Sequence, residues 1–122
     1  MKVEIKNAKI ESTMLGFEGH GILTCMIYLD YGGTSQGFGG YGFDSPIKDD
    51  NDRFLRREGV AYGMEFIKRI LEVVGVDKWE NLKGERIRAK AEHGKVHAIG
   101  HFLEDKWFEP EKDLKYFHTE TD

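Results

Sequence analysis

The sequence predicts a single α+β domain, residues 1–122, in which an antiparallel sheet packs against one long amphipathic helix. Residues 2–43 and 86–103 carry strand patterns, mostly alternating apolar and polar side chains, whereas residues 57–74 repeat apolar side chains at helical spacing. A chain of 122 residues has the length of one domain and can bury a substantial core. We expect an N-terminal antiparallel β meander, the long helix plus a short helix, a C-terminal β hairpin and a docked tail.

The first two strands of the meander differ in their apolar pattern. The first begins near Val3, and its alternation changes phase near Asn7, which predicts a bulge there. The second, residues 22–29, is apolar on both faces. That pattern is typical of a strand in the middle of a sheet, or of one covered on its second face by another chain.

Residues 36–43 form a third strand of alternating aromatic and glycine residues. Such a strand is typically bent or bulged where another backbone approaches closely. Alternatively, the missing side chains leave a shallow depression walled by Phe38, Tyr41 and Phe43, in which a planar base could lie. The glycines do not follow the spacing of a dinucleotide-binding loop, and the order of elements lacks its parallel β-α-β units.

A polar loop is expected over residues 44–57, followed by a helix from about Arg57 to Val74. Its apolar side chains form two adjacent stripes, which are Val60, Met64, Ile67, Leu71 and Val74, and Phe66, Ile70 and Val73. So wide an apolar surface usually needs more than one sheet face to cover it, and a partner subunit could supply the rest. Gly75 is expected to end the helix, and residues 77–80 have the spacing of a capping box that opens a short helical turn.

The C-terminal region returns to strand patterns. Residues 86–91 and 96–103 are expected to pair as a hairpin around a turn at His93-Gly94-Lys95. Aromatic residues then continue into the tail, so we expect the tail to dock, with a short helix after Pro110.

Composition excludes several classes of protein. A formal net charge of −4 argues against a general nucleic-acid-binding protein, which is normally basic. No apolar run approaches the length of a membrane-spanning helix, and the first residues lack the apolar run of a signal peptide. The single cysteine, Cys25, fits a reducing cytosol and lies in an apolar strand, where an inert core thiol is expected.

Catalytic and metal-binding motifs are not apparent, so we expect a binding protein rather than an enzyme, with no cofactor. Neither G-x-S-x-G nor H-E-x-x-H occurs. His93, His97 and His101 are spaced by four, but the flanking pattern predicts strands, on which residues four apart lie about 13 Å from each other. One zinc ion needs its ligands within about 2.1 Å, so no single-ion site is expected.

The segment from Arg53 to Glu58 carries three arginines at the expected junction of loop and helix. Cations are unfavourable beside a helix N-terminus, and a docked anion would relieve this, because arginine holds phosphate through two hydrogen bonds. The alternative is that these arginines pair with the aspartates of residues 49–52. On the functional interpretation, Arg56 and Arg57 bind phosphate while aromatic rings stack a base. The expected ligand-binding residues are Arg53, Arg56, Arg57, Phe17, Gln36, Phe38, Tyr41 and Trp107.

A second basic set, Arg86, Arg88 and Lys90, lies on one face of an expected hairpin strand. Solvated charge on an edge strand is one interpretation of this pattern. A second anion site is the other.

Short motifs spread over residues 3–110 resemble a known family. They are Asn7–Thr13, Leu15–Glu18, Gly21–Thr24, Leu29–Gly32, Gln36–Tyr41, Ala61–Ile67, Ile99–Leu103 and Lys106–Phe108. Together they resemble the first family of Thoeris anti-defence proteins, which are small phage proteins.

The resemblance implies a phage protein that acts in the cytoplasm of an infected bacterium. Such proteins bind and sequester the cyclic ADP-ribose-type signal made by the TIR enzyme of the defence system, without degrading it, and some also hold cyclic oligonucleotide signals in separate pockets. The resemblance further implies a homo-oligomer, from a dimer up to a hexamer, whose pockets form between subunits from the N-terminal sheet and C-terminal helices. The resemblance also implies that Arg57 contacts a phosphate of the ligand.

Two other functions are compatible with the sequence. One is a phage inhibitor that binds a host defence or nucleic-acid enzyme through its acidic surface. The other is a small nucleotide hydrolase, which would release a cleaved product.

Overall fold

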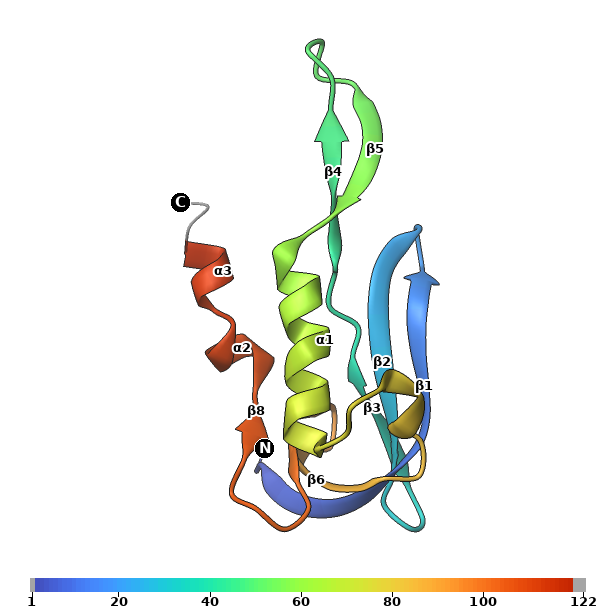
Figure 1. Ribbon diagram of the computed structural model, residues 1–122, viewed down its shortest axis with the longest axis vertical. Coiled ribbons are helices and arrows are strands. Elements are labelled where there is room, and N and C mark those ends of the chain that lie inside the picture. The colour runs from blue at the N-terminus through green and yellow to red at the C-terminus, as the bar shows by residue number, and fades with distance from the viewer. Residues whose placement is uncertain (1, 120–122) are drawn as a thin grey trace.

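The structure, a computed structural model, describes residues 2–119 (Figure 1). It confirms the α+β class, with strands that pair antiparallel, one long helix and short helices. The elements in order are β1 (Glu4–Glu18), β2 (Ile22–Asp30), β3 (Ser35–Gly39), β4 (Asp44–Lys48), β5 (Phe54–Gly59), α1 (Ala61–Val74), the 3-10 turn η1 (Trp79–Asn81), β6 (Arg86–Glu92), β7 (Lys95–His101), β8 (Trp107–Phe108), α2 (Pro110–Asp113) and α3 (Tyr116–Thr119).

Six of these strands form one sheet in the order β3-β2-β1-β6-β7-β8, and β4 pairs with β5 in a separate hairpin. The expected meander is the β3-β2-β1 part of the sheet, and the expected C-terminal hairpin is β6–β7. β2 lies between β3 and β1, as its two apolar faces predict. Because β3 also lies beside β7, the sheet curves around the core.

The core forms where α1 packs against the concave side of this sheet. Phe66, at the middle of α1, is completely buried and lies within 5.0 to 5.9 Å, between ring centroids, of five other aromatic rings. Phe108 and Leu114 of the tail are also completely buried, so the tail docks as expected. Of the two apolar stripes on α1, the one containing Phe66 is covered, whereas Met64 on the other is 71% exposed.

The expected loop over residues 44–57 is wrong, because this segment forms the β4–β5 hairpin (Figure 1). The carboxylate of Asp49 accepts hydrogen bonds from the backbone N–H groups of Asn51 and Arg53, which closes the turn, and Asp52 adopts a positive φ of 62°. The aspartates of residues 49–52, which suggested a solvated loop, therefore lie in the turn of the hairpin.

The expected start of the helix at Arg57 is also wrong. Residues up to Gly59 are paired in β5, and Val60 remains extended, with φ −117° and ψ 154°, so α1 begins at Ala61. The end of the helix at Gly75 is confirmed, since Gly75 has a φ of 90° and the N–H groups of Gly75 and Val76 both donate to the carbonyl of Leu71.

Two smaller expectations need correction. The bulge in β1 lies between Ile10 and Ser12 rather than near Asn7. A short helical turn does follow Gly75, but no side chain caps η1, so the capping-box interpretation of residues 77–80 is wrong.

The glycine-rich third strand is the close-approach strand that its composition favours. Gly39 has a φ of 124°, and a Cβ atom on Gly39 would overlap the carbonyl oxygen of Cys25. The N–H of Gly40 donates to that same oxygen, at 2.9 Å. The backbone of β3 therefore approaches that of its neighbour β2 closely at Gly39, and the Phe38 side chain is buried in the core.

We expect Gly39→Ala to lower the free energy of unfolding by about 1–3 kcal/mol, because it combines overpacking with a strained backbone. Urea denaturation followed by circular dichroism measures this loss. Gly33→Ala is the matched control, since a Cβ atom there meets nothing within 4 Å. Equal stability of the two variants would contradict the close approach of β3 to β2.

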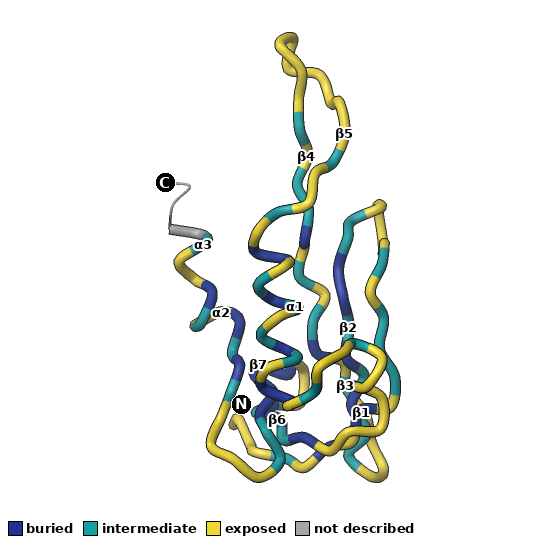
Figure 2. The backbone as a smooth tube through the Cα atoms, in the orientation of Figure 1, coloured by how far each residue is buried: buried dark blue, intermediate teal, exposed yellow. Residues whose placement is uncertain are grey.

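The β4–β5 hairpin extends away from the sheet, and most of its residues are exposed (Figures 1 and 2). Phe54 and Leu55 on β5 are 65% and 54% exposed. In the part of the chain that is described, no helix combines the length and apolar character needed to cross a bilayer.

Candidate functional site

A groove with a volume of about 410 Å³ opens at the start of α1, between the β3–β4 connection and the C-terminal tail. Its lining is mostly apolar and aromatic. The lining residues are Tyr41, Gly42, Asp44, Ser45, Val60, Ala61, Tyr62 and Phe117. The aromatic rings come from three separate parts of the chain, and the rings of Tyr62 and Phe117 meet edge to face at 5.7 Å.

The polar end of the groove is an ion pair between β4 and β5. The guanidinium of Arg57 donates to the Oδ1 atom of Asp44 from Nε, at 3.0 Å, and from Nη2, at 2.8 Å. Nη2 also donates to the backbone carbonyl of Asp44, at 3.1 Å. The hydrogen bond from Arg57 lowers the pKa of Asp44 below its usual value, so this carboxyl is ionised at neutral pH.

The N-terminal end of α1 lies at the same groove, since Val60, Ala61 and Tyr62 line it. No side chain caps this helix, and its first turn holds no acidic residue. The first N–H groups of a helix carry partial positive charge, which favours an anion nearby. The groove thus joins aromatic walls to an uncapped helix end and an arginine–aspartate pair.

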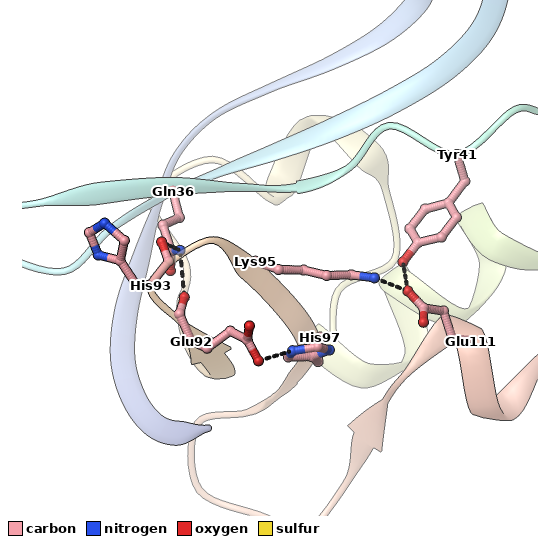
Figure 3. Close-up of polar contacts among 7 residues, drawn as sticks. All are labelled: Gln36, Tyr41, Glu92, His93, Lys95, His97 and Glu111. Atoms are coloured by element: carbon pink, nitrogen blue, oxygen red, sulfur yellow. Dashed lines mark hydrogen bonds and ion pairs between the residues drawn. The ribbon is translucent and has the colours of Figure 1, made fainter. Parts of the chain in front are cut away.

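A polar cluster borders the groove on the side of Tyr41 (Figure 3). The Tyr41 hydroxyl donates to Oε2 of Glu111 at 3.1 Å, and Lys95 pairs with the same carboxylate oxygen. Burial, followed by the charge of Glu111, raises the pKa of Tyr41. The hydrogen bonds from Lys95 and Tyr41 lower the pKa of Glu111. Glu111 is therefore ionised and Tyr41 protonated at neutral pH.

Of the expected ligand-binding residues, Tyr41 lines this groove and Arg57 holds its acidic edge. Phe38 does not, because it is completely buried between Phe66 and Phe108, which corrects the expectation that it walls an open depression. Phe17 lies near the end of β1, 73% exposed, and is not among the groove residues.

Gln36 joins strand β3 to the β6–β7 turn and is not among the groove residues (Figure 3). Its Nε2 atom donates to the backbone carbonyls of Glu92 and His93, at 2.9 and 3.1 Å, and its Oε1 accepts from the Tyr31 hydroxyl at 2.6 Å. These contacts tie β3 to the β6–β7 turn. Gln36 therefore acts structurally in this conformation.

The three arginines do not converge on one point. They lie on or beside an exposed strand of a hairpin and not at a helix start, which corrects the argument from the helix dipole. Arg56 and Arg57 are neighbours on β5, so their side chains leave opposite faces, and Arg56 pairs with Glu58. Pairing with carboxylates is thus found, although the partners are Asp44 and Glu58 rather than the aspartates of the turn.

Trp107 and the second basic set meet on the sheet. The guanidinium of Arg88 and the ammonium of Lys90 lie 4.8 and 4.3 Å from the centre of the Trp107 ring. Arg88 also donates to the backbone carbonyls of His101 and Glu104, at 2.9 and 2.8 Å. Because β6 lies between β1 and β7, the edge-strand interpretation is wrong. The second anion site at Arg86, Arg88 and Lys90 stays a prediction.

Four residues at the groove were not expected there from the sequence, namely Asp44, Tyr62, Phe117 and Glu111. The pairing of Asp44 with Gly59 brings Asp44 to the start of α1, and recognising the hairpin would have revealed that proximity. Tyr62 lies next to an apolar stripe of α1 and ends in a hydroxyl group. That combination could have marked it as a candidate binding residue. Phe117 and Glu111 depend on how the tail docks, and no local pattern encodes that position.

Two of the expected histidines, His97 and His101, and the cysteine have structural surroundings. His97 pairs with Glu92 at 3.0 Å, and Nδ1 of His101 accepts hydrogen bonds from the N–H groups of Leu103 and Glu104. Over the described residues, no group of three or more His, Cys, Asp or Glu side chains is placed to hold a metal ion. Burial raises the pKa of the Cys25 thiol to about 12, as expected for a core thiol.

We expect Cys25 to resist iodoacetamide in the folded protein at pH 8 and to react fully in 6 M guanidinium chloride, because only the exposed thiolate is reactive. Mass spectrometry of the modified chain measures the extent of reaction. Rapid alkylation of the native protein would contradict the burial of Cys25.

Comparisons with protein-family models, with curated proteins and with solved structures found no match to this chain.

Proposed function

We propose that this chain binds a phosphorylated ribonucleotide of the cyclic ADP-ribose type in the groove at the start of α1 and holds it without degrading it. The observation that carries the proposal is the meeting, in one groove, of aromatic rings with the Asp44–Arg57 pair and the uncapped end of α1. A nucleotide has a base that suits the aromatic rings and a phosphate that suits Arg57 and the end of the helix.

The aromatic walls suit a base. Tyr41, Tyr62 and Phe117 present ring surface in a largely apolar groove. Stacking of a base on an aromatic side chain contributes about 1–3 kcal/mol and depends little on the identity of the base. Ser45, which also lines the groove, offers its hydroxyl as a hydrogen-bond partner to a sugar hydroxyl.

The opposite charge needed by a phosphate comes from the helix end and Arg57. Backbone N–H groups at a helix N-terminus bind phosphate oxygens, and an arginine nearby adds charge-assisted hydrogen bonds. Arg57 is held in place by Asp44 and keeps 27% of its side chain exposed.

Sequestration needs tight binding and an intact ligand. A nanomolar dissociation constant corresponds to about −12 kcal/mol, which a stacked base and two or three charge-assisted phosphate contacts can supply in a preformed site. The sequence offers no known catalytic motif, which supports holding over hydrolysis. The resemblance to the first Thoeris anti-defence family supports a phage protein acting in the host bacterial cytoplasm.

We also propose that the chain forms a homo-oligomer, from a dimer up to a hexamer. Exposed apolar side chains support this, namely Phe17 on β1, Phe54 and Leu55 on β5, and Met64 on α1. A two-stranded hairpin such as β4–β5 is only marginally stable by itself in water, so a second copy packed on it would stabilise it. Light scattering at micromolar concentration should give at least twice 14.0 kDa, and a monomeric mass would contradict the proposal.

The binding proposal is tested by calorimetric titration with cyclic ADP-ribose, followed by heating the complex and chromatography of the released molecule. We expect saturable binding and recovery of the unchanged ligand. Recovery of a hydrolysed product would favour a nucleotide hydrolase. No binding of the nucleotide, together with a stable complex with a host enzyme, would favour an inhibitor that acts by protein–protein contact.

A further inference from the structure

The C-terminal tail supplies one wall of the groove and is joined by a polar contact to another wall. Phe117 of α3 lines the groove from the tail, and Tyr41 lines it from the β3–β4 connection. Glu111 of α2 accepts the hydrogen bond from the Tyr41 hydroxyl and also pairs with Lys95 of β7 (Figure 3). Residues separated by 70 positions in the chain thus meet through one carboxylate.

We propose that Glu111 is a positioning residue that sets the geometry of the groove by holding the tail, with its Phe117 wall, against the Tyr41 wall. Two further contacts of the tail, both made by Asp113, lead elsewhere. Asp113 of α2 accepts the N–H of Glu109, at 2.9 Å, and lies 3.6 Å from the guanidinium of Arg69 on α1. Those contacts fix the tail to itself and to the helix, whereas Glu111 fixes it to Tyr41.

The tail also has apolar anchors that do not involve Glu111. Leu114 and Phe108 are completely buried in the core and anchor the tail on both sides of α2. Glu111 is exposed apart from its contacts with Tyr41 and Lys95, so its loss leaves the apolar anchors in place. A variant of Glu111 is therefore expected to fold while losing the fixed distance between the two walls.

The ion pair and hydrogen bond keep Glu111 in its charged form. Lys95 and the Tyr41 hydroxyl lower the pKa of Glu111, and the charge of His97 acts in the same direction. Burial, followed by the charge of this carboxylate, also raises the pKa of the Tyr62 hydroxyl. At neutral pH the contact with Tyr41 is consequently one between a phenol donor and a carboxylate acceptor, which is stronger than a neutral pair.

A double-mutant cycle between Glu111 and Tyr41 tests the inference, which rests on the proposed function for its choice of cyclic ADP-ribose as the probe. Tyr41→Phe removes the hydroxyl and keeps the ring. We expect Glu111→Ala and Tyr41→Phe each to weaken calorimetric binding about three- to tenfold, and the double variant to be no weaker than the weaker single variant. Glu111→Gln, whose amide oxygen still accepts from Tyr41 but carries no charge for Lys95, should bind more tightly than Glu111→Ala and more weakly than the unchanged protein. Additive losses, or a Glu111→Gln variant as weak as Glu111→Ala, would overturn the inference.

Hydrogen exchange of the protein without ligand separates this inference from the proposed function. The amides of residues 110–117 should exchange several-fold faster in Glu111→Ala and Tyr41→Phe, while Lys112→Ala, an exposed residue of the same tail, should leave them unchanged. If these exchange rates change but the wild-type protein does not bind cyclic ADP-ribose, the proposed function fails while the role of Glu111 in holding the tail stands. If the exchange rates do not change, that role of Glu111 is wrong whatever the binding data show.

Discussion

Phe66→Ala is expected to lower the free energy of unfolding by about 3–5 kcal/mol, which is a large part of the stability of a domain of this size. Phe66 is completely buried, and its ring meets those of Phe38, Phe43 and Phe108, which belong to the sheet side of the core. Truncation would leave a cavity between α1 and the sheet that these rings cannot close. Urea denaturation monitored by tryptophan fluorescence measures the loss.

The control for this variant lies two residues further along α1. Lys68→Ala removes an exposed side chain whose ion pair with Glu72 is on the surface, so it should change the free energy of unfolding by less than about 0.5 kcal/mol. A Phe66→Ala variant as stable as Lys68→Ala would show that the aromatic cluster is not the centre of the core.

Arg57→Ala is expected to weaken binding of cyclic ADP-ribose about 10- to 100-fold, because it removes charge-assisted hydrogen bonds to the phosphate. The same change leaves Asp44, whose side chain is only 6% exposed, without its cation beside the ligand. Calorimetry at low salt measures the affinity. Arg53→Ala is the control, since Arg53 is exposed and does not line the groove. This variant should bind cyclic ADP-ribose as the wild-type protein does.

The pH dependence of the Arg57–Asp44 pair gives a second readout of the same variant. Because Arg57 lowers the pKa of Asp44, the pair stabilises the folded state above the ordinary pKa of an aspartate, and this contribution is lost as the pH falls through the lowered pKa. In Arg57→Ala, NMR titration should find the Asp44 pKa moved upward. An unchanged Asp44 pKa would show that the two groups are not coupled in solution.

Much of the fold could be predicted because it follows from local periodicity. The alternation in β1, β6 and β7, and the helical spacing that ends at Gly75, identify these elements and their buried faces. The β4–β5 hairpin was missed because its residues are mostly exposed, so no face of it shows an apolar pattern. Its signal lies in the turn, where Asp49 accepts two backbone hydrogen bonds.

The candidate site was predictable only in part, because it depends on contacts between distant segments. Arg57 and Tyr41 were identified from their chemistry, but the argument that placed Arg57 at a helix end was wrong. Phe38 resembled an exposed aromatic because glycines surround it, yet the close approach of β3 to β2 buries it completely. Asp44 and Glu111 enter the site through pairing of strands and docking of the tail, which a local pattern cannot reveal.

The central claim is that the groove beside α1 receives the nucleotide, and NMR of the labelled aromatic rings during titration with cyclic ADP-ribose tests it most directly. We predict that the ring signals of Tyr41, Tyr62 and Phe117 shift and saturate together, while those of Phe54, at the far end of the β4–β5 hairpin, do not move with them. Saturable binding with unchanged groove signals, or no binding at all, would contradict the claim.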